Sequence, residues 1–193
     1  NFSKVFLIKY TNIQKKIEQL EIENKTFDIS ESLKKSKEDI KTRRDTIKIE
    51  QLQNLQIKIN KKMEEINNYI YEGKKKPPIL ILSGNQYTFY TMDDTGTGSS
   101  YKSMIVYDLS ILEMTQLPIL IHDSVILKQI SDIAIEKILL KYKSTKKQIF
   151  ISLDKISSYS EISKAILKDE EVKVLELSIN GNELFGRSWN DRE

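Results

Sequence analysis

The sequence contains no cysteine and only three prolines, six glycines and one histidine among its 193 residues. Without cysteine there are no disulfide bonds and no thiolate metal sites, which is compatible with a reducing cytoplasm. The longest apolar run falls far short of the ~18 residues that a membrane-spanning helix needs, and the start lacks the layout of a signal peptide. We therefore expect a cytoplasmic protein with no membrane segment. The absence of an initiating methionine favours a fragment of a longer chain.

Charge is abundant but nearly balanced. Lys and Arg number 31 and Asp and Glu number 28, which gives a formal net charge of +3 at pH 7. This balance is no strong argument for nucleic acid, so DNA is a partner that the composition permits but does not indicate. Charged residues make up 31% of the chain, which is typical of a long solvated helix attached to a core.

Residues 1–76 have the pattern of a helical arm. They contain no proline, and their only glycine is Gly73. Two series spaced by seven predict the a and d positions of a coiled coil. An earlier helical stretch ends near residues 24–30, whose Thr, Asp and Ser residues are typical of helix breakers and caps, so we expect two helices with an interruption. The first sevenfold series is Ile49, Gln56, Met63 and Ile70, with Gln56 as a polar exception, and the second is Leu52, Ile59 and Ile66.

From residue 77 the pattern changes to short strands and helices. Runs at 79–83 and 86–92, joined by Gly84 and Asn85, predict a β-hairpin. Alternating helices and apolar strands follow, and this order predicts an α/β lobe over 77–193 with a mixed, mainly parallel sheet. The continuous apolar run at 117–122 predicts a strand that is buried on both faces. The expected helices are 99–115, 130–143 and 159–168, and the other expected strands are 148–153 and 172–178.

The loop before the helix at 99–115 contains the sequence GTGSSYKS, residues 96–103. It departs from the phosphate-binding pattern G-x-x-x-x-G-K-[ST] because Tyr101 occupies the second glycine position. A true phosphate loop would use Lys102 and Ser103 as ligands. A plain glycine turn would use Ser99 or Ser100 to cap the helix.

A third interpretation follows from the order of the elements. A loop of small residues opens a helix, and that helix precedes an apolar strand that ends on Asp123. This order is similar to the signature segment and Walker B strand of ABC-type ATPases. There the start of the helix presses on the γ-phosphate of an ATP bound by the opposing subunit. The residues that would contact ATP in this interpretation are Gly96, Thr97, Gly98, Ser99 and Ser100.

Three residues near the ends of the apolar strands are candidates for chemistry. Asp123 could bind Mg²⁺ or orient an attacking water, or it could cap the following turn. His122 is a candidate catalytic residue because of its place beside the expected phosphates, although a lone histidine is more often packed or hydrogen-bonded. Asp154 could bind Mg²⁺, pair with a lysine or cap a loop. Because ligands lie beyond the carboxyl ends of strands in α/β sheets, we expect Asp123, Asp154 and the glycine loop to share one edge.

The block at residues 93–132, DDTGTGSSYKSMIVYDLSILEMTQLPILIHDSVILKQISD, resembles the DUF2326 region, the C-terminal part of bacterial ATPases similar to SMC and RecN proteins. LPILIHDS is its most specific piece, and the resemblance extends over roughly 60–190. It implies a C-terminal lobe that an N-terminal Walker A lobe of the same protein completes into an ATPase head. It also implies ATP and Mg²⁺ in the complete head, no activity in this chain alone, and homodimerisation through heads or coiled coil.

Two departures from the pattern keep a second interpretation open. His122 and Asp123 stand where ABC-type ATPases generally have Asp-Glu, so Asp123 replaces either the metal-binding Asp or the catalytic Glu. Asp154 stands where these proteins usually have the switch histidine. The chain could therefore be a non-enzymatic coiled-coil dimer that carries a partner-binding module. Relatives of the family are linked to DNA repair or to mobile-element and phage defence, and the resemblance implies the same setting here.

Overall fold

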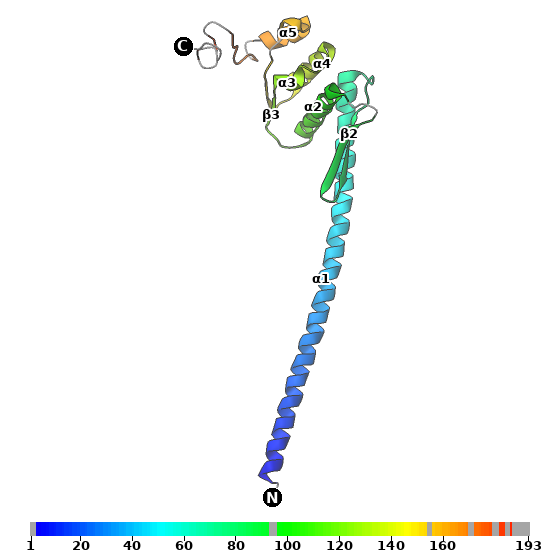
Figure 1. The fold of residues 1–193 in the computed structure, drawn as a ribbon, viewed down its shortest axis with the longest axis vertical. Helices are drawn as coiled ribbons and strands as arrows, with labels where there is room; N and C mark the ends of the chain where they lie inside the picture. Colours follow the sequence, from blue (N-terminus) through cyan, green and yellow to red (C-terminus); the bar gives the residue numbers. More distant parts are fainter. Residues whose placement is uncertain are drawn as a thin grey trace. The chain divides into compact units, whose positions relative to one another are not determined.

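The computed structural model describes residues 3–92, 96–153, 156–169, 172–178, 182–183 and 186, and the side chain of Thr97 lies outside that description. The chain divides into two compact units, Asn1–Asn54 and Leu55–Glu193. Helix α1 (Lys4–Tyr71) begins in the first unit and ends in the second. The other elements belong to the second unit (Figure 1): β1 (Pro78–Ser83), β2 (Gln86–Thr91), α2 (Thr97–Met114), β3 (Ile119–His122), α3 (Ser124–Leu127), α4 (Asp132–Ser144), β4 (Gln148–Ile151), the 3-10 helix η1 (Ile156–Ser158) and α5 (Glu161–Lys168).

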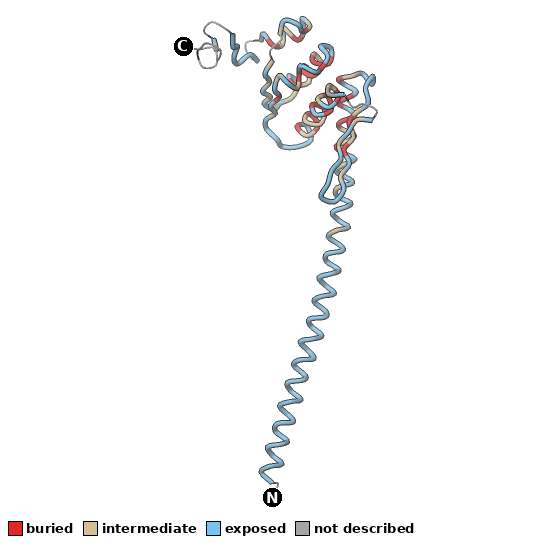
Figure 2. The backbone as a smooth tube through the Cα atoms, viewed as in Figure 1, coloured by how far each residue is buried: buried red, intermediate tan, exposed pale blue. Residues whose placement is uncertain are grey.

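In the first unit α1 is uninterrupted, so the predicted break near residues 24–30 is wrong. Thr26 does not cap a helix, because its hydroxyl donates to the carbonyl oxygen of Ile22 at 2.8 Å. At about 100° per residue, Phe6, Ile13 and Leu20 lie roughly opposite Leu33, Ile40 and Ile47, but Ile8 and Ile22 lie on the same side as the later residues, so the apolar residues do not form one face. All of these residues are exposed (Figure 2).

In the second unit the apolar residues of α1 are part of the core. Met63 is fully buried, and Ile66 and Ile70 are each 2% exposed. They belong to one hydrophobic cluster with Ile105 of α2 and Ile138 of α4. The sevenfold spacing from residue 59 onward therefore reflects a helix face that is buried in the lobe, where the sequence predicted a coiled coil. For the same reason the two units divide after residue 54, whereas the sequence placed the boundary after residue 76.

Helix α1 ends at Tyr71, close to the position predicted from Gly73 and the proline pair. Glu72 and Gly73 both have positive φ, 53° and 73°. Glycine adopts this conformation without steric cost, which is why it commonly closes helices. Pro78 then opens β1, because proline tolerates the start of a strand but cannot continue a helix.

The strands of the second unit form two small sheets. β1 and β2 form the predicted antiparallel hairpin, in a register that pairs Ser83 with Gln86 across the turn. β3 and β4 form a parallel pair, in which His122 lies opposite Ile151. The mixed α/β class is therefore confirmed.

The predicted mainly parallel sheet is not formed within the described residues. Residues 173–177 have no regular secondary structure where a third strand was expected, and Ser178 makes a single bridge with Asn182. The strand at 117–122 is also not buried on both faces, because Ile119 is 45% and Ile121 is 72% exposed. Apolar runs of this kind are typical of strands covered on both sides, and among the described residues β3 pairs with one strand, β4.

Candidate functional site

The turn that opens α2 is built on Gly96. Its carbonyl oxygen accepts hydrogen bonds from the N–H groups of Ser99 and Ser100 at 3.0 and 3.2 Å. Both serines lie inside α2 and neither caps it, so the predicted serine cap is wrong. The Ser99 hydroxyl is buried and has no hydrogen-bond partner among the described residues. A buried polar group beside the first N–H groups of a helix is an environment that suits an anionic ligand.

Gly98 lies where α2 meets the segment that follows α3. A Cβ atom at this position would lie 3.3 Å from the backbone carbonyl oxygen of Gln129. Such a contact is tight, so the close approach favours glycine. α3 begins directly after Asp123, so the backbone that approaches Gly98 lies in the same segment, six residues after Asp123.

Lys102 and Ser103 have hydrogen-bond partners outside the glycine turn. Lys102 is 2% exposed, and its Nζ donates to the carbonyl oxygen of Lys76 at 2.8 Å. The same amine lies 5.5 Å from the ring centroid of Tyr71. The Ser103 hydroxyl forms a hydrogen bond of 2.7 Å with that of Thr91 in β2. This geometry disfavours both residues as phosphate ligands, and the role predicted for Lys102 stays a prediction.

Asp123 stands at the end of β3 and caps α3. Its Oδ1 accepts from the hydroxyl of Ser152 at 2.5 Å and from the N–H of Ser124 at 2.7 Å. These hydrogen bonds hold the pKa of the exposed carboxyl below its usual value, and the hydrogen bond from Ser152 has the larger effect. Ser152 directly follows β4, so the ends of the two parallel strands converge on this carboxylate. A carboxylate and a hydroxyl are oxygen donors that suit Mg²⁺, which often takes one or two carboxylates and completes its shell with phosphates and water.

His122 precedes Asp123, and its side chain points into the core. It is 2% exposed, and its Nε2 lies 3.1 Å from Oδ2 of Asp108 on α2. Its Nδ1 forms a short hydrogen bond with the hydroxyl of Tyr142 on α4. Burial, helped by the charge of Asp108, raises the pKa of Tyr142, so this hydroxyl keeps its proton. The ring of His122 is fully engaged with protein groups, and its predicted catalytic role stays a prediction.

The structure thus brings Asp123 together with Ser152, and it places Gln129, which follows α3, beside the glycine turn. Asp154, which was expected at the same edge, lies outside the described residues, and its role stays a prediction. Within the described ranges, no group of three or more His, Asp or Glu side chains is arranged to hold a metal ion.

Sequence reasoning missed Asp108, Tyr142 and Ser152. Nothing in the linear pattern relates two helical residues to the end of a strand, so Asp108 and Tyr142 had no signal. The sequence did contain a signal for Ser152, because this residue follows the strand at 148–151 just as Asp123 follows β3.

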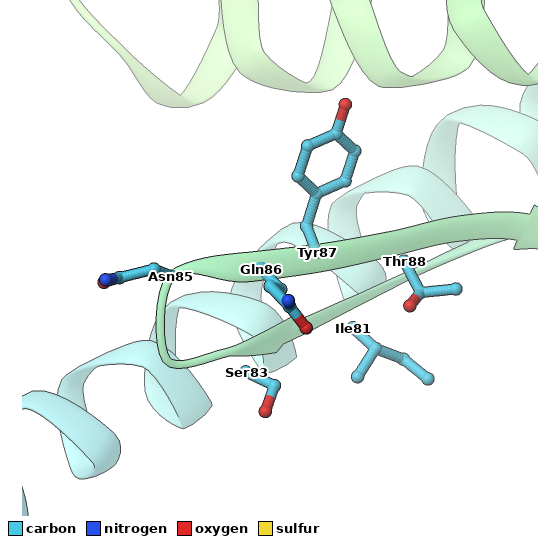
Figure 3. Close-up of a pocket in the computed structure, with 6 residues that line it drawn as sticks. All are labelled: Ile81, Ser83, Asn85, Gln86, Tyr87 and Thr88. Carbon is cyan, nitrogen blue, oxygen red and sulfur yellow. The ribbon is translucent and has the colours of Figure 1, made fainter.

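A surface pocket lies away from these residues, at the turn of the β1–β2 hairpin (Figure 3). Its lining carries no charged side chain, and Tyr87 projects from the opposite side of the strand to Thr88 (Figure 3). No candidate residue of the glycine turn or of β3 contributes to it, so the pocket is not part of the candidate site. It is lined by Ile81, Ser83, Asn85, Gln86, Tyr87 and Thr88.

The fold and site define an α/β lobe with a glycine turn at the start of one helix and an acidic residue at the end of a parallel strand. Residues 38–189 match the family described as an uncharacterised protein conserved in bacteria (DUF2326), and the chain belongs to this family. None of the curated proteins matches the chain. Among the described residues, no helix is both long enough and apolar enough to cross a membrane.

Solved structures of SMC proteins are similar to this chain at low sequence identity. One comes from work on the structural biochemistry of ATP-driven dimerization and DNA-stimulated activation of SMC ATPases. It is 12% identical with a TM-score of 0.47, and the similarity covers 67% of this chain and 81% of that chain. Another is the Smc head domain from Pyrococcus furiosus, with an extended coiled coil, bound to the C-terminal domain of ScpA. It is 14% identical with a TM-score of 0.42, covering 84% of this chain and 45% of that chain.

Proposed function

We propose that the chain is the C-terminal lobe of an SMC/RecN-like ATPase head, with α1 as the root of its arm. An N-terminal lobe carrying Walker A would complete the head and bind ATP with Mg²⁺. Two complete heads would close around ATP and move the arms, a mechanical output of the hinge or rigid-body kind. The proposed setting, DNA repair or defence against mobile elements and phages, rests on the family resemblance.

The observation that carries this proposal is the close approach of Gln129, in the segment that begins at Asp123, to Gly98 in the turn at the start of α2. The residues of this turn, from Gly96 to Ser100, would contact the γ-phosphate bound by the opposing head. The buried Ser99 hydroxyl without a partner supports a ligand at this helix start. Asp123 is exposed and has a lowered pKa, so its carboxylate is ionised at neutral pH and would hold Mg²⁺ or orient the attacking water.

The β3–β4 pair supports completion by a second lobe. Parallel sheets are normally covered on both faces, yet Ile119, Ile121 and Phe150 are 45%, 72% and 42% exposed. An N-terminal lobe that extends or covers this sheet would bury these side chains.

One observation favours the second candidate, a non-enzymatic partner-binding module. The Asp123 carboxylate already caps α3 and binds Ser152, so a structural role alone explains its position. In that case Lys102, Ser103 and His122 would all be parts of the packed interior, and the exposed apolar face of β3–β4 would bind a protein.

The test is titration with a fluorescent ATP analogue and Mg²⁺, first with this chain and then with the protein that includes its N-terminal half. We expect no micromolar binding by the chain alone, and binding with turnover by the longer protein. Asp123→Asn should lower kcat roughly a hundredfold or more while nucleotide binding persists, because loss of a group that assists chemistry typically has this effect.

Asp39→Asn is the matched control, because it removes an exposed carboxylate of α1 and should leave turnover unchanged. Equal turnover in Asp123→Asn and the unaltered longer protein would refute the role of Asp123. Failure of the longer protein to bind ATP would favour the partner-binding module.

A further inference from the structure

We infer that His122 is a positioning residue, which holds the end of β3, and with it Asp123, in a fixed place relative to α2 and α4. The inference adds Asp108 and Tyr142 to the site and rests on the proposed function for its consequence in ATP turnover. Three elements, β4, α2 and α4, contact this one residue.

The backbone of His122 is held by β4. Its carbonyl oxygen accepts from the N–H of Ser152 at 3.1 Å, the residue whose hydroxyl binds Asp123. A displacement of His122 would therefore move both the backbone that precedes Asp123 and the group that orients its carboxylate.

The side chain of His122 is held by two helices. Asp108 on α2 faces Nε2 at 3.1 Å, and the Tyr142 hydroxyl on α4 faces Nδ1. A carboxylate can only accept, so Nε2 carries a proton. In the tautomer with this proton alone, Nδ1 accepts from the tyrosine hydroxyl. One neutral tautomer thus satisfies both partners, and the buried ring is left with no unpaired nitrogen.

This arrangement connects the two parts of the proposed site by a route separate from α3. Asp108 belongs to the helix that opens with the glycine turn, and His122 belongs to the strand that ends at Asp123. The imidazole therefore fixes the distance between the group proposed to contact the γ-phosphate and the carboxylate proposed to act on Mg²⁺ or water. In ordinary proteins such fixed buried partners orient catalytic groups without touching the substrate.

The first experiment uses this chain, whose single histidine gives one set of imidazole signals. Long-range ¹H–¹⁵N NMR spectra should show the Nε2–H tautomer. The amide resonance of Ser124, whose N–H donates to Asp123, reports the place of the carboxylate. His122→Leu should shift that resonance, and Tyr142→Phe should shift it less because one of the two side-chain anchors remains. Asp39→Asn and Tyr90→Phe, both at exposed residues, are controls that should leave it unchanged.

The second experiment measures ATP turnover by the longer protein. His122→Leu should lower kcat roughly tenfold to a hundredfold, as small misplacements of reacting groups do, with KM within about twofold. His122→Gln keeps a donor that can reach Asp108 and should recover part of the loss. A lower kcat together with a higher KM and a lower melting temperature would mean a purely structural role and would overturn the inference.

The two experiments separate this inference from the proposed function. If the longer protein has no ATP turnover, the proposed function fails, and the NMR experiment still decides whether His122 positions Asp123. An Nδ1–H tautomer, or an unmoved Ser124 resonance in His122→Leu, would overturn the inference. If His122→Leu does not fold, Tyr142→Phe and Asp108→Asn replace it, and an unmoved Ser124 resonance in both would have the same meaning.

Discussion

The side-chain amide of Asn60 pairs with the backbone of Leu80 in both directions. It donates to the carbonyl oxygen of Leu80 and accepts from its N–H, each at 2.8 Å. One turn earlier, Gln56 accepts from the N–H of Leu82 at 2.8 Å. Two side-chain amides of α1 thereby form hydrogen bonds with backbone groups on the edge of β1 that does not pair with β2. An unpaired strand edge is a site of unwanted pairing with other strands.

Asn60→Ala should lower the free energy of unfolding by about 1–3 kcal/mol, because it leaves a partly buried N–H and C=O without partners. The measurement is urea unfolding, combined with hydrogen exchange at the Leu80 amide, which should exchange faster. Asn24→Ala is the matched control on the exposed first part of α1. It should be neutral or slightly stabilising, because alanine favours the helix more than asparagine does. Equal effects of the two substitutions would show that the Asn60–Leu80 pairing contributes nothing.

A second pair of substitutions tests which part of α1 belongs to the core. Ile66 is 2% and Ile40 is 67% exposed. Ile66→Ala should cost about 2–5 kcal/mol through lost burial and a cavity, and Ile40→Ala should change stability by less than about 0.5 kcal/mol. Urea unfolding of both variants gives the comparison. A large cost at Ile40 would mean that the first part of α1 is packed against another helix in solution.

These two predictions show why the arm could be foreseen only in part. Helix content, the end of α1 near Gly73 and the hairpin follow from local chemistry, and all three were predicted. The sevenfold spacing of Met63 and Ile70 correctly identified an apolar face, but spacing alone cannot say whether a partner helix or the chain's own lobe covers it. Gln56 broke the apolar series for a tertiary reason, its hydrogen bond to β1, which no linear pattern contains.

The candidate site was foreseen to a similar degree. Asp123 could be located because acidic residues at strand ends are a local signal, and Gly98 because small residues open tight turns. The orientation of Lys102 could not, because it depends on a carbonyl oxygen 26 residues earlier. The partners of His122 lie on two helices that are separate in sequence, so their meeting at one ring is a property of the packed fold.

The ion pairs of Glu113 lead us to expect that the stability of the protein depends on pH. Glu113 binds Lys141 at 2.7 Å and Lys62 at 2.9 Å. Burial opposes ionisation, but the hydrogen bonds from Lys141 and Lys62 outweigh it and lower the pKa of Glu113 below 4.5. The hydrogen bond to Glu113 likewise raises the pKa of Lys62 above 10.5. A carboxyl group whose pKa is lowered in the folded state stabilises the fold at pH values above the pKa of the unfolded state. A lysine whose pKa is raised stabilises the fold at pH values below the pKa of the unfolded state. This network therefore stabilises the protein between about pH 4.5 and 10.5.

Glu113→Gln should lower the melting temperature at pH 7 by about 2–4 °C, the shift expected for the roughly 1 kcal/mol of a partly exposed pair. The difference from the unaltered protein should shrink as pH falls below 4.5, where Glu113 itself becomes protonated, and it should also shrink in high salt. Thermal melts across pH and salt provide the measurement. Glu64→Gln, at an exposed position of α1, should show neither effect. A difference that stays constant as the pH falls would indicate lost packing and not lost charge.

The last prediction tests whether Lys102 is a buried structural residue or a phosphate ligand. Its amine binds the carbonyl oxygen of Lys76 beside the ring of Tyr71. Lys102→Met fills a similar volume and should change stability little, because loss of the hydrogen bond is offset by relief from burying a charge. Lys102→Ala should cost about 2–5 kcal/mol through the cavity it leaves. Urea unfolding of both variants measures this difference.

In the longer protein, the affinity for the fluorescent ATP analogue should be nearly the same with Lys102→Met as with lysine. Lys25→Met, at an exposed position of α1, controls for the loss of one positive charge. If Lys102→Met folds normally but loses nucleotide binding roughly a hundredfold, as expected on removal of a buried charged contact to a ligand, then GTGSSYKS is a working phosphate loop. The turn at Gly96 would in that case hold the chain's own nucleotide, and the lysine would have to leave Lys76 to reach it.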